Sequence, residues 1–273
     1  MVGMPRKDHD SRKLPKDDFR RNRAYLADHL FALSSGESGK PTDKISRNAW
    51  RSLVQLPTDV VLRTSDYQGS IVQDCVRQSG GWNKTCPLSR HQSPVMGIPA
   101  MDAWDEFEAA IFLASHGWYR QATACLRVAL ENVAQGSGFA VTNAKKEYKK
   151  WRKSDGKLDW GKSIGRLKRA DLPAIMQAVW PILSRLYGDL SKATHAEVGK
   201  SSSDHWESTG PIWAPKAFVE FWLDYCDTIA ACYVLLKLGW PVMVLPKRAR
   251  VLFALPSERW NGCGPNLLNE LFA

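Results

Sequence analysis

Three polar side chains near residue 190 follow one another at helical spacing. Tyr187, Ser191 and His195 stand at i, i+4 and i+8, so on a helix they line a single strip. Hydroxyl groups in such a strip can hold a substrate by hydrogen bonds, and a histidine can exchange protons near neutral pH. The strip is therefore a candidate catalytic site. The alternative is that His195 is a structural histidine whose hydrogen bonds are satisfied inside the fold.

A charged pair lies earlier in the chain, at the edge of an apolar helical face. Arg127 and Glu131 are spaced i, i+4 and are surrounded in sequence by Leu126, Val128 and Leu130. An exposed pair of this kind adds only roughly 0.2–0.5 kcal/mol to a helix. A partly buried pair is costly to desolvate, and is retained for helix register or for a functional site. Spacing alone leaves both interpretations open.

Positive charge is concentrated in two segments of the chain. The net charge is +10, and residues 142–170 hold eleven Lys or Arg against three acids, a net of +8. Residues 1–23 hold eight bases and four acids, a net of +4. Because the remainder is close to neutral, the two basic segments indicate an anionic partner.

Basic and aromatic residues are interleaved within the first of these segments. Lysine and arginine neutralise phosphates, and aromatic rings stack on bases, so the mixture suits a nucleic acid. The predicted nucleic-acid-binding residues are Lys145, Lys146, Lys149, Lys150, Trp151, Arg152 and Lys153. The alternative is a solvated helical face whose tryptophans are tucked into the core.

Cysteine usage predicts free thiols and no metal. The six cysteines include no C-x-x-C pair, which favours a reducing, cytoplasmic compartment. Cys75, Cys86 and His91 fit no familiar zinc spacing, so we expect neither a metal nor another cofactor. A zinc hydrolase built on these residues and His205 is a weaker alternative.

No segment predicts a membrane partner. Residues 1–13 lack the apolar core of a secretory signal. The most apolar stretch, 218–238, contains four charged residues and is followed by Gly239, Trp240 and Pro241. A membrane span is therefore not expected.

The candidate residues must be positioned by helices, and a predicted hairpin at 102–136 organises them. Trp104, Phe107, Ile111 and Ala114 share one face of a first helix. Gly117 can take the left-handed conformation that ends it. The second helix carries its own apolar face and is expected to stop at Gly136. Small residues in both helices allow close approach.

The rest of the chain predicts further helices around this hairpin. We expect a disordered basic arm at 1–16, N-terminal helices and a loop-rich region at 17–98, a helical bundle at 99–240, and a C-terminal tail at 241–273 that packs on the bundle or a partner. In the loop-rich region only a short helix near 70–78 is predicted. Later helices are expected at 143–153, 160–169, 172–179, 181–196 and 216–238.

Two phrases of the sequence together resemble a known group of proteins. HGWYRQATACLRVALE at 116–131 and RLYGDLSKATHAE at 185–197 resemble the L-R-x-x-L-E hairpin and the Y-x-x-L-S-x-x-x-H helix of bacterial helical proteins near the HEPN superfamily (higher eukaryotes and prokaryotes nucleotide-binding). The resemblance covers roughly residues 100–240. It implies an all-α, antiparallel helical bundle that is frequently dimeric, and so a homo-oligomer.

The resemblance also implies a function class. Many relatives are RNases of toxin–antitoxin, abortive-infection or other phage-defence systems. The polar positions that match here are Arg127, Glu131, Tyr187, Ser191 and His195. The RNases carry an Arg and a His separated by four to six residues on one helix, whereas nine residues separate Arg185 from His195. Arg23 and His29 have the right spacing, but chance predicts roughly one such pair in this chain.

Two functions stay open from the sequence. In the first, the protein acts on or binds nucleic acid, with RNA foremost: His195 exchanges a proton with the RNA, Arg127 holds a phosphate, and Glu131 fixes the arginine. In the second, the chain is a non-catalytic interaction or dimerisation module of a defence or regulatory complex, with a partner encoded nearby. There the same polar residues lock the helix register. Both functions require the residues near 127 and near 195 to meet in one pocket.

Overall fold

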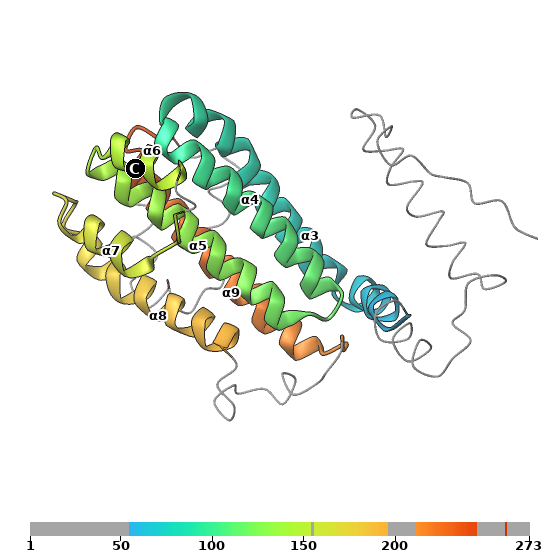
Figure 1. Ribbon diagram of the computed structural model, residues 1–273. Coiled ribbons are helices and arrows are strands. Elements are labelled where there is room, and N and C mark those ends of the chain that lie inside the picture. The colour runs from blue at the N-terminus through green and yellow to red at the C-terminus, as the bar shows by residue number, and fades with distance from the viewer. Residues whose placement is uncertain (1–54, 154–155, 196–210, 245–259, 261–273) are drawn as a thin grey trace, which may run out of the picture. The chain divides into compact units, whose positions relative to one another are not determined.

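Every secondary-structure element of the described chain is a helix (Figure 1). The computed structural model describes residues 55–153, 156–195, 211–244 and 260, except for the side chains of 87–92, 94 and 193–195. The helices are α3 (Leu56–Gln92), α4 (Pro94–Ser115), α5 (Tyr119–Val141), α6 (Lys145–Lys153), α7 (Trp160–Lys168), α8 (Met176–His195) and α9 (Pro215–Gly239). These residues contain no strand, so the prediction of an all-α fold is confirmed.

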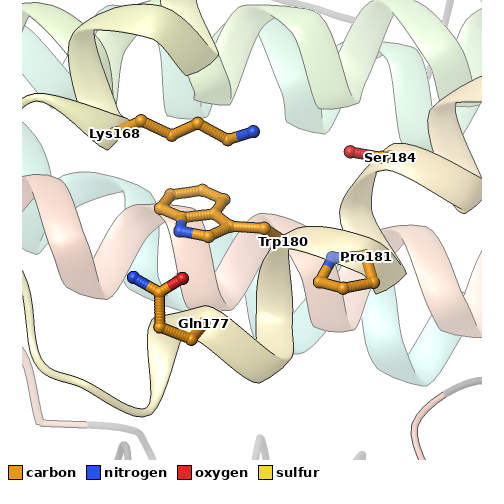
Figure 2. A pocket seen from close by; sticks show the side chains of 5 residues that line it. All are labelled: Lys168, Gln177, Trp180, Pro181 and Ser184. Carbon is orange, nitrogen blue, oxygen red and sulfur yellow. The ribbon is translucent and has the colours of Figure 1, made fainter.

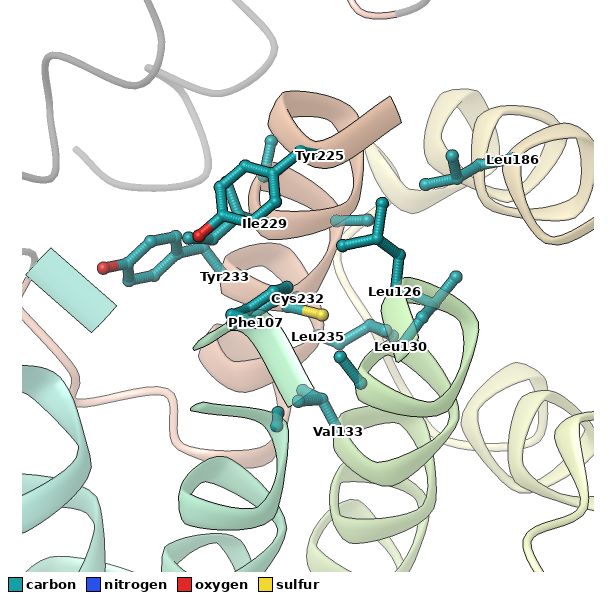
Figure 3. Close-up of a cluster of buried hydrophobic side chains, with 14 of the residues drawn as sticks. Phe107, Leu126, Leu130, Val133, Leu186, Tyr225, Ile229, Cys232, Tyr233 and Leu235 are labelled. Carbon is teal, nitrogen blue, oxygen red and sulfur yellow. The ribbon is translucent and has the colours of Figure 1, made fainter. Parts of the chain in front are cut away.

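Helix α5 is the central element, and it packs against α4, α9, α7 and α8. Leu126, Leu130 and Val133 lie beside α9 (Figure 3). Between residues 129 and 139, only Asn132 is not buried. A helix that is buried almost all round depends on neighbours on every side, and α5 therefore fixes the relative positions of the helices around it.

A tight turn at Gly117 joins α4 to α5. The φ angle of Gly117 is +82°, a conformation that glycine adopts without strain. The N–H of Trp118 closes the turn by donating to the carbonyl of Leu113 at 2.9 Å. A Cβ at position 117 would lie 2.5 Å from the carbonyl oxygen of Ile212, so no side chain fits. The predicted end of the first helix at this glycine is confirmed.

The hairpin is longer than predicted at both ends. α4 begins at Pro94 rather than near Asp102, because proline suits the first helical turn, where its missing N–H costs no hydrogen bond. α5 continues through Gly136 to Val141. A Cβ at Gly136 would lie 2.8 Å from Cγ of Pro99. This glycine therefore lets α4 and α5 approach closely and does not end the helix.

The region predicted to be loop-rich is a helix, so this prediction was wrong. α3 spans Leu56–Gln92, and Gln68 is the residue inside it with non-helical dihedral angles. Its buried positions recur at helical spacing but carry many small or polar side chains: Val60, Thr64, Gln68, Cys75, Gln78, Ser79, Trp82, Thr85 and Cys86. Because of these residues, the spacing of apolar side chains alone does not reveal that this face is buried. Its glycines are tolerated because tertiary packing outweighs helix propensity.

The N-terminal part of α8 also differs from the prediction. A break was expected between a helix at 172–179 and another beginning at Pro181, but α8 runs from Met176 to His195 with Pro181 inside it. Proline removes one intrahelical N–H. Its side chain is exposed, so the ring needs no space inside the bundle.

Aromatic rings fill the core between α3, α4 and α9. Ring centroids lie 4.8 Å apart for Trp82 and Tyr233, and 5.6 Å apart for Phe107 and Tyr225; the last three residues appear in Figure 3. Both pairs meet edge to face, a favourable aromatic geometry. The predicted last long helix is present as α9. None of the described helices has the length and apolar character needed to cross a membrane.

Several predicted segments lie wholly or mostly outside the described residues. They are the basic arm at 1–16, the N-terminal helices expected from residue 17, and the tail beyond residue 244.

The buried cysteines predict a loss of stability in alkaline solution. The five described cysteines carry free thiols, and burial raises the pKa of Cys86 and Cys226 from 9.0 to about 12. Above pH 9.0 the unfolded chain therefore releases protons that the folded chain keeps. The free energy of unfolding is at its full value below that pH and falls as the pH rises toward about 12.

Urea unfolding at about pH 8 and about pH 10.5 measures this loss. Removing one buried thiol, as in Cys86→Ala, is expected to reduce the difference in the free energy of unfolding between the two pH values. An unchanged difference would show that Cys86 does not contribute to it.

Candidate functional site

Arg127, Glu131 and Tyr187 form a closed hydrogen-bond network between α5 and α8. The Nε of Arg127 donates to Oε1 of Glu131 at 3.2 Å, and its Nη2 donates to the Tyr187 hydroxyl at 3.1 Å. The hydroxyl of Tyr187 donates in turn to the same Glu131 oxygen at 2.8 Å. The structure thus brings Arg127 and Glu131 together with Tyr187, which stands far from them in sequence. The approach of His195, which both predicted functions also require, stays a prediction.

The network lies mostly inside the bundle. Only 19% of the Arg127 side chain and 10% of the Glu131 side chain are exposed. At this depth a charged pair is costly to desolvate, and breaking it by removing one partner is strongly destabilising. The pair therefore differs from the exposed intrahelical pair that spacing alone allowed.

The ring of Tyr187, like its hydroxyl, contacts neighbouring side chains. Trp160, the first residue of α7, stacks on this ring with centroids 4.4 Å apart and planes 5° from parallel. The guanidinium carbon of Arg127 lies 5.3 Å from the ring centroid, within range of a cation–π contact. Trp160 lies within the basic segment at 142–170 and extends the network to α7.

The electrostatics of the site keep Tyr187 protonated. Burial and the hydrogen bond to Glu131 raise the pKa of Tyr187 above 10.0. The hydroxyl is therefore a donor at neutral pH, and it satisfies the carboxylate. The three side chains can fix α5 against α8 without any ligand.

The other two residues of the predicted strip are placed less completely. Ser191 lies one turn beyond Tyr187 on α8, and its buried hydroxyl has no hydrogen-bond partner among the described residues. His195 is the last residue of α8, but its side chain lies outside the described part of the chain. The strip is helical as predicted, and the position of the imidazole stays a prediction.

A second group of candidate residues forms an exposed basic surface. The predicted cations of α6 are all exposed: Lys145, Lys146, Lys149, Lys150, Arg152 and Lys153. Arg166 of α7 pairs with Glu147 of α6 at 3.6 Å, so the two basic helices are neighbours. Lys162, Lys168 and Arg169 are also exposed. We call the cations of α6, α7 and Arg169 the α6–α7 basic surface.

Trp151 belongs to a small aromatic cluster at this surface. Its ring lies 5.9 Å from Phe139 and 6.1 Å from Tyr148, and its indole N–H donates to the carbonyl of Lys157 at 3.1 Å. Trp151 is half-buried, so it anchors α6 with only part of its ring open. The lysines around it stay free to contact phosphates.

A cleft in the α6–α7 basic surface was not singled out from the sequence. Lys162, Arg166 and Arg169 line it together with Gly161 and Gly165. The two glycines are one helical turn apart, and a Cβ at Gly165 would meet nothing within 4 Å. Three cations therefore line a cleft in which the two glycines leave open space. Glycines at i, i+4 among basic residues were the pattern that could have indicated it.

The residues considered for a metal occupy other roles. Cys86 is buried and its thiol donates to the carbonyls of Trp82 and Ala100. Burial also raises the pKa of Cys75 well above 9.0. No group of three or more His, Cys, Asp or Glu suited to a metal occurs among the described residues. The side chains of His91 and His205 lie outside them.

Comparison with known proteins assigns the chain to no family: no family model, no curated protein and no solved structure matches it.

The polar network predicts a large effect of removing its arginine. Arg127→Ala leaves Glu131 buried with one partner fewer, so we expect the free energy of unfolding to fall by more than about 2 kcal/mol. Tyr187→Phe keeps the ring and its stacking on Trp160 but removes two hydrogen bonds, and we expect a loss of about 1–3 kcal/mol.

Urea unfolding measures both changes, and an exposed pair on α8 supplies the control. Lys192 and Asp189 are 3.1 Å apart, with 62% and 35% of their side chains exposed. Lys192→Ala should cost less than about 1 kcal/mol. If Arg127→Ala costs no more than this control, the network does not hold α5 and α8 together.

Proposed function

We propose that this protein binds nucleic acid, RNA foremost, through the α6–α7 basic surface. The observation that carries the proposal is the juxtaposition of two exposed basic helices, which the Arg166–Glu147 pair joins at 3.6 Å. Lysines that are exposed and point to solvent can reach phosphates without breaking interactions inside the fold. Each phosphate contact releases counterions, which gives affinity without sequence specificity.

The cleft beside α7 supports the same partner. A phosphate is recognised by cations in fixed positions. Arg166 is held by Glu147 and by the ring of Phe139, whose centroid lies 4.1 Å from its guanidinium carbon. Lys162 is paired with Asp159 at 3.1 Å. Held in this way, Arg166 offers a preorganised contact, while the exposed Lys162 and Arg169 add positive charge.

We further propose that the fold is an antiparallel, HEPN-like bundle. The resemblance at 116–131 and 185–197 motivates this assignment. The contact of Arg127 and Glu131 with Tyr187 supports it, because the two motif segments then share one pocket. Within that fold, the catalytic version of the function is a metal-independent RNase.

The chemistry of such an RNase requires a proton acceptor and a stabiliser of negative charge. The ribose 2′-oxygen attacks phosphorus and its proton passes to the His195 imidazole, while the 5′-oxygen leaves with a proton returned to it. Arg127 would hold the phosphate oxygens, and Glu131 would orient Arg127. The missing Arg-x(4–6)-His spacing separates this proposal from the usual signature.

The second candidate function is a non-catalytic helical module of a defence or regulatory complex. The closed hydrogen-bond network favours it, because Arg127, Glu131 and Tyr187 satisfy one another without a substrate. In this version the network only sets helix register, and a protein partner or a second copy of the chain binds elsewhere.

Salt-dependent binding tests the nucleic-acid proposal. A fluorescently labelled single-stranded RNA is titrated with the protein at several salt concentrations. Each phosphate contact with a single strand contributes about 0.7 to the slope of log affinity against log salt. The triple variant of Lys146→Ala, Lys149→Ala and Lys150→Ala should therefore bind more weakly, and the magnitude of its slope should be smaller by about 2.

Lys216→Ala is the matched control, because Lys216 is exposed but lies on α9 rather than on α6 or α7. It should leave the slope unchanged. Absence of wild-type binding at low salt would overturn the nucleic-acid proposal and leave the module.

A second experiment separates catalysis from binding. His195→Ala should abolish cleavage of a labelled RNA while leaving RNA affinity and Tm nearly unchanged, since an imidazole that only transfers protons contributes little to folding. A large drop in Tm would make His195 a structural residue. Wild-type protein that binds RNA but never cleaves it would show that the chain is not an RNase.

A further inference from the structure

A second cleft opens between the end of α7 and the first turns of α8 (Figure 2). It has a volume of about 540 Å³ and is lined by Lys168, Gln177, Trp180, Pro181 and Ser184. The four α8 residues stand at i, i+3, i+4 and i+7, so they share one helical face. Lys168 is the last residue of α7. Lys168 belongs to the α6–α7 basic surface, whereas the four α8 residues belong neither to that surface nor to the polar network.

Trp180 supplies a flat apolar face to this cleft. The indole is half-buried and packs partly against the hydrophobic core, which holds the ring in place. The Nζ of Lys168 lies over the ring, 6.0 Å from its centroid, at the outer limit of a cation–π contact. The ammonium stands at the end of a flexible side chain, so a stacked base can take its place over the ring.

Polar groups surround the ring and carry no partner of their own. Gln177 and Ser184 are exposed, and neither side chain makes a hydrogen bond to another described residue. In the view of Figure 2 the Lys168 side chain runs along one side of the indole toward Ser184, and Gln177 lies on the other. An amide that donates and accepts can read the edge of a planar heterocycle, and the hydroxyl can do the same.

The charge of the cleft selects among ligands. Lys168 is its one ionisable lining residue, and Arg169 follows directly in sequence. A flat ring, hydrogen-bonding groups and a cation together match a nucleobase with its phosphate. An apolar peptide side chain would use the ring but neither the Gln177 amide nor the Lys168 ammonium.

We infer that this cleft, which we call the Trp180 cleft, binds one nucleobase of a single-stranded nucleic acid. The base stacks on Trp180, its edge contacts Gln177 or Ser184, and Lys168 contacts a neighbouring phosphate. The inference rests on the proposed function, because α7 carries the basic surface that would hold the rest of the strand. It adds a stacking site to a surface that otherwise recognises only phosphates.

The experiment compares a short oligouridine of about twelve nucleotides with an abasic strand of the same length. Wild-type protein should bind the oligouridine more tightly. Trp180→Leu keeps an apolar side chain against the core but removes the aromatic face, and should weaken oligouridine binding by roughly tenfold or more. Its salt slope should stay unchanged, because no phosphate contact is lost. Trp180→Phe should restore most of the affinity.

Two further variants sharpen the result. Phe112→Ala removes an aromatic side chain that is 62% exposed on α4 and should leave binding unchanged. Lys168→Ala should reduce the magnitude of the salt slope by about 0.7. Circular dichroism and Tm verify that each variant is folded.

Each outcome has a distinct meaning. If wild-type protein prefers oligouridine over the abasic strand but Trp180→Leu keeps that preference, bases are bound elsewhere and the Trp180 cleft is not the site. Equal wild-type binding of both strands overturns base stacking while leaving the phosphate-binding surface intact. Binding of neither strand at low salt overturns the proposed function and the inference together. If uridine monophosphate binds saturably but neither strand binds, the occupant of the Trp180 cleft is a free nucleotide. That result would overturn the inference that the cleft binds a base of a single-stranded nucleic acid.

Discussion

A buried carboxylate must be given hydrogen-bond donors, and Glu131 imposes this requirement on the centre of the bundle. Only 8% of Glu131 is exposed. Arg127 from its own helix and Tyr187 from α8 supply the donors. An unpaired buried charge would cost several kcal/mol. A shift of α8 along α5 would separate Tyr187 from Glu131, and this costs more than the loss of a single apolar contact. The register of these two helices follows from this constraint.

The same constraint reaches the surfaces that we propose for binding. Tyr187 contacts Arg127 and stacks on Trp160, and Trp160 begins α7. The N-terminus of α7 is fixed further by Asp159, whose carboxylate accepts from the N–H of Lys162 at 2.9 Å, a capping bond that satisfies an orphan donor. α7 then carries its cations to the α6–α7 basic surface and Lys168 to the Trp180 cleft. A polar network inside the bundle therefore sets the position of charges outside it.

The parts of the fold that could be predicted from sequence are those where local pattern and tertiary packing agree. α6, α7 and α9 have strong periodicity or clear end residues, and the turn at Gly117 has the one residue type that suits its φ angle. α3 could not be predicted as one helix, because its inward face uses Cys75, Ser79 and Thr85 where an apolar residue was sought. The break expected before Pro181 is absent for a similar reason. Proline destabilises the helix only locally, and the packing of α8 outweighs this loss of stability. Of the site, the resemblance at 116–131 and 185–197 led to a pocket shared by Arg127, Glu131 and Tyr187, which spacing alone could not indicate. The Trp180 cleft escaped notice, because Lys168 and Trp180 lie on different elements and only the packing of α7 beside α8 brings them together.

Binding and catalysis place different demands on this structure. The lysines of α6 are already solvated, so a phosphate replaces water and counterions at little cost to the fold. Arg127 is already bound by Glu131 and Tyr187, and each hydrogen bond to a charged group contributes about 1.5–3 kcal/mol. A phosphate that recruits Arg127 must either offset those bonds or contact the guanidinium beside them. A contact beside them leaves the network intact, whereas exchange would loosen α5 from α8. Any catalytic role for Arg127 must therefore work with a guanidinium that stays in place, and the nucleic-acid binding that we propose for α6 and α7 does not depend on that role.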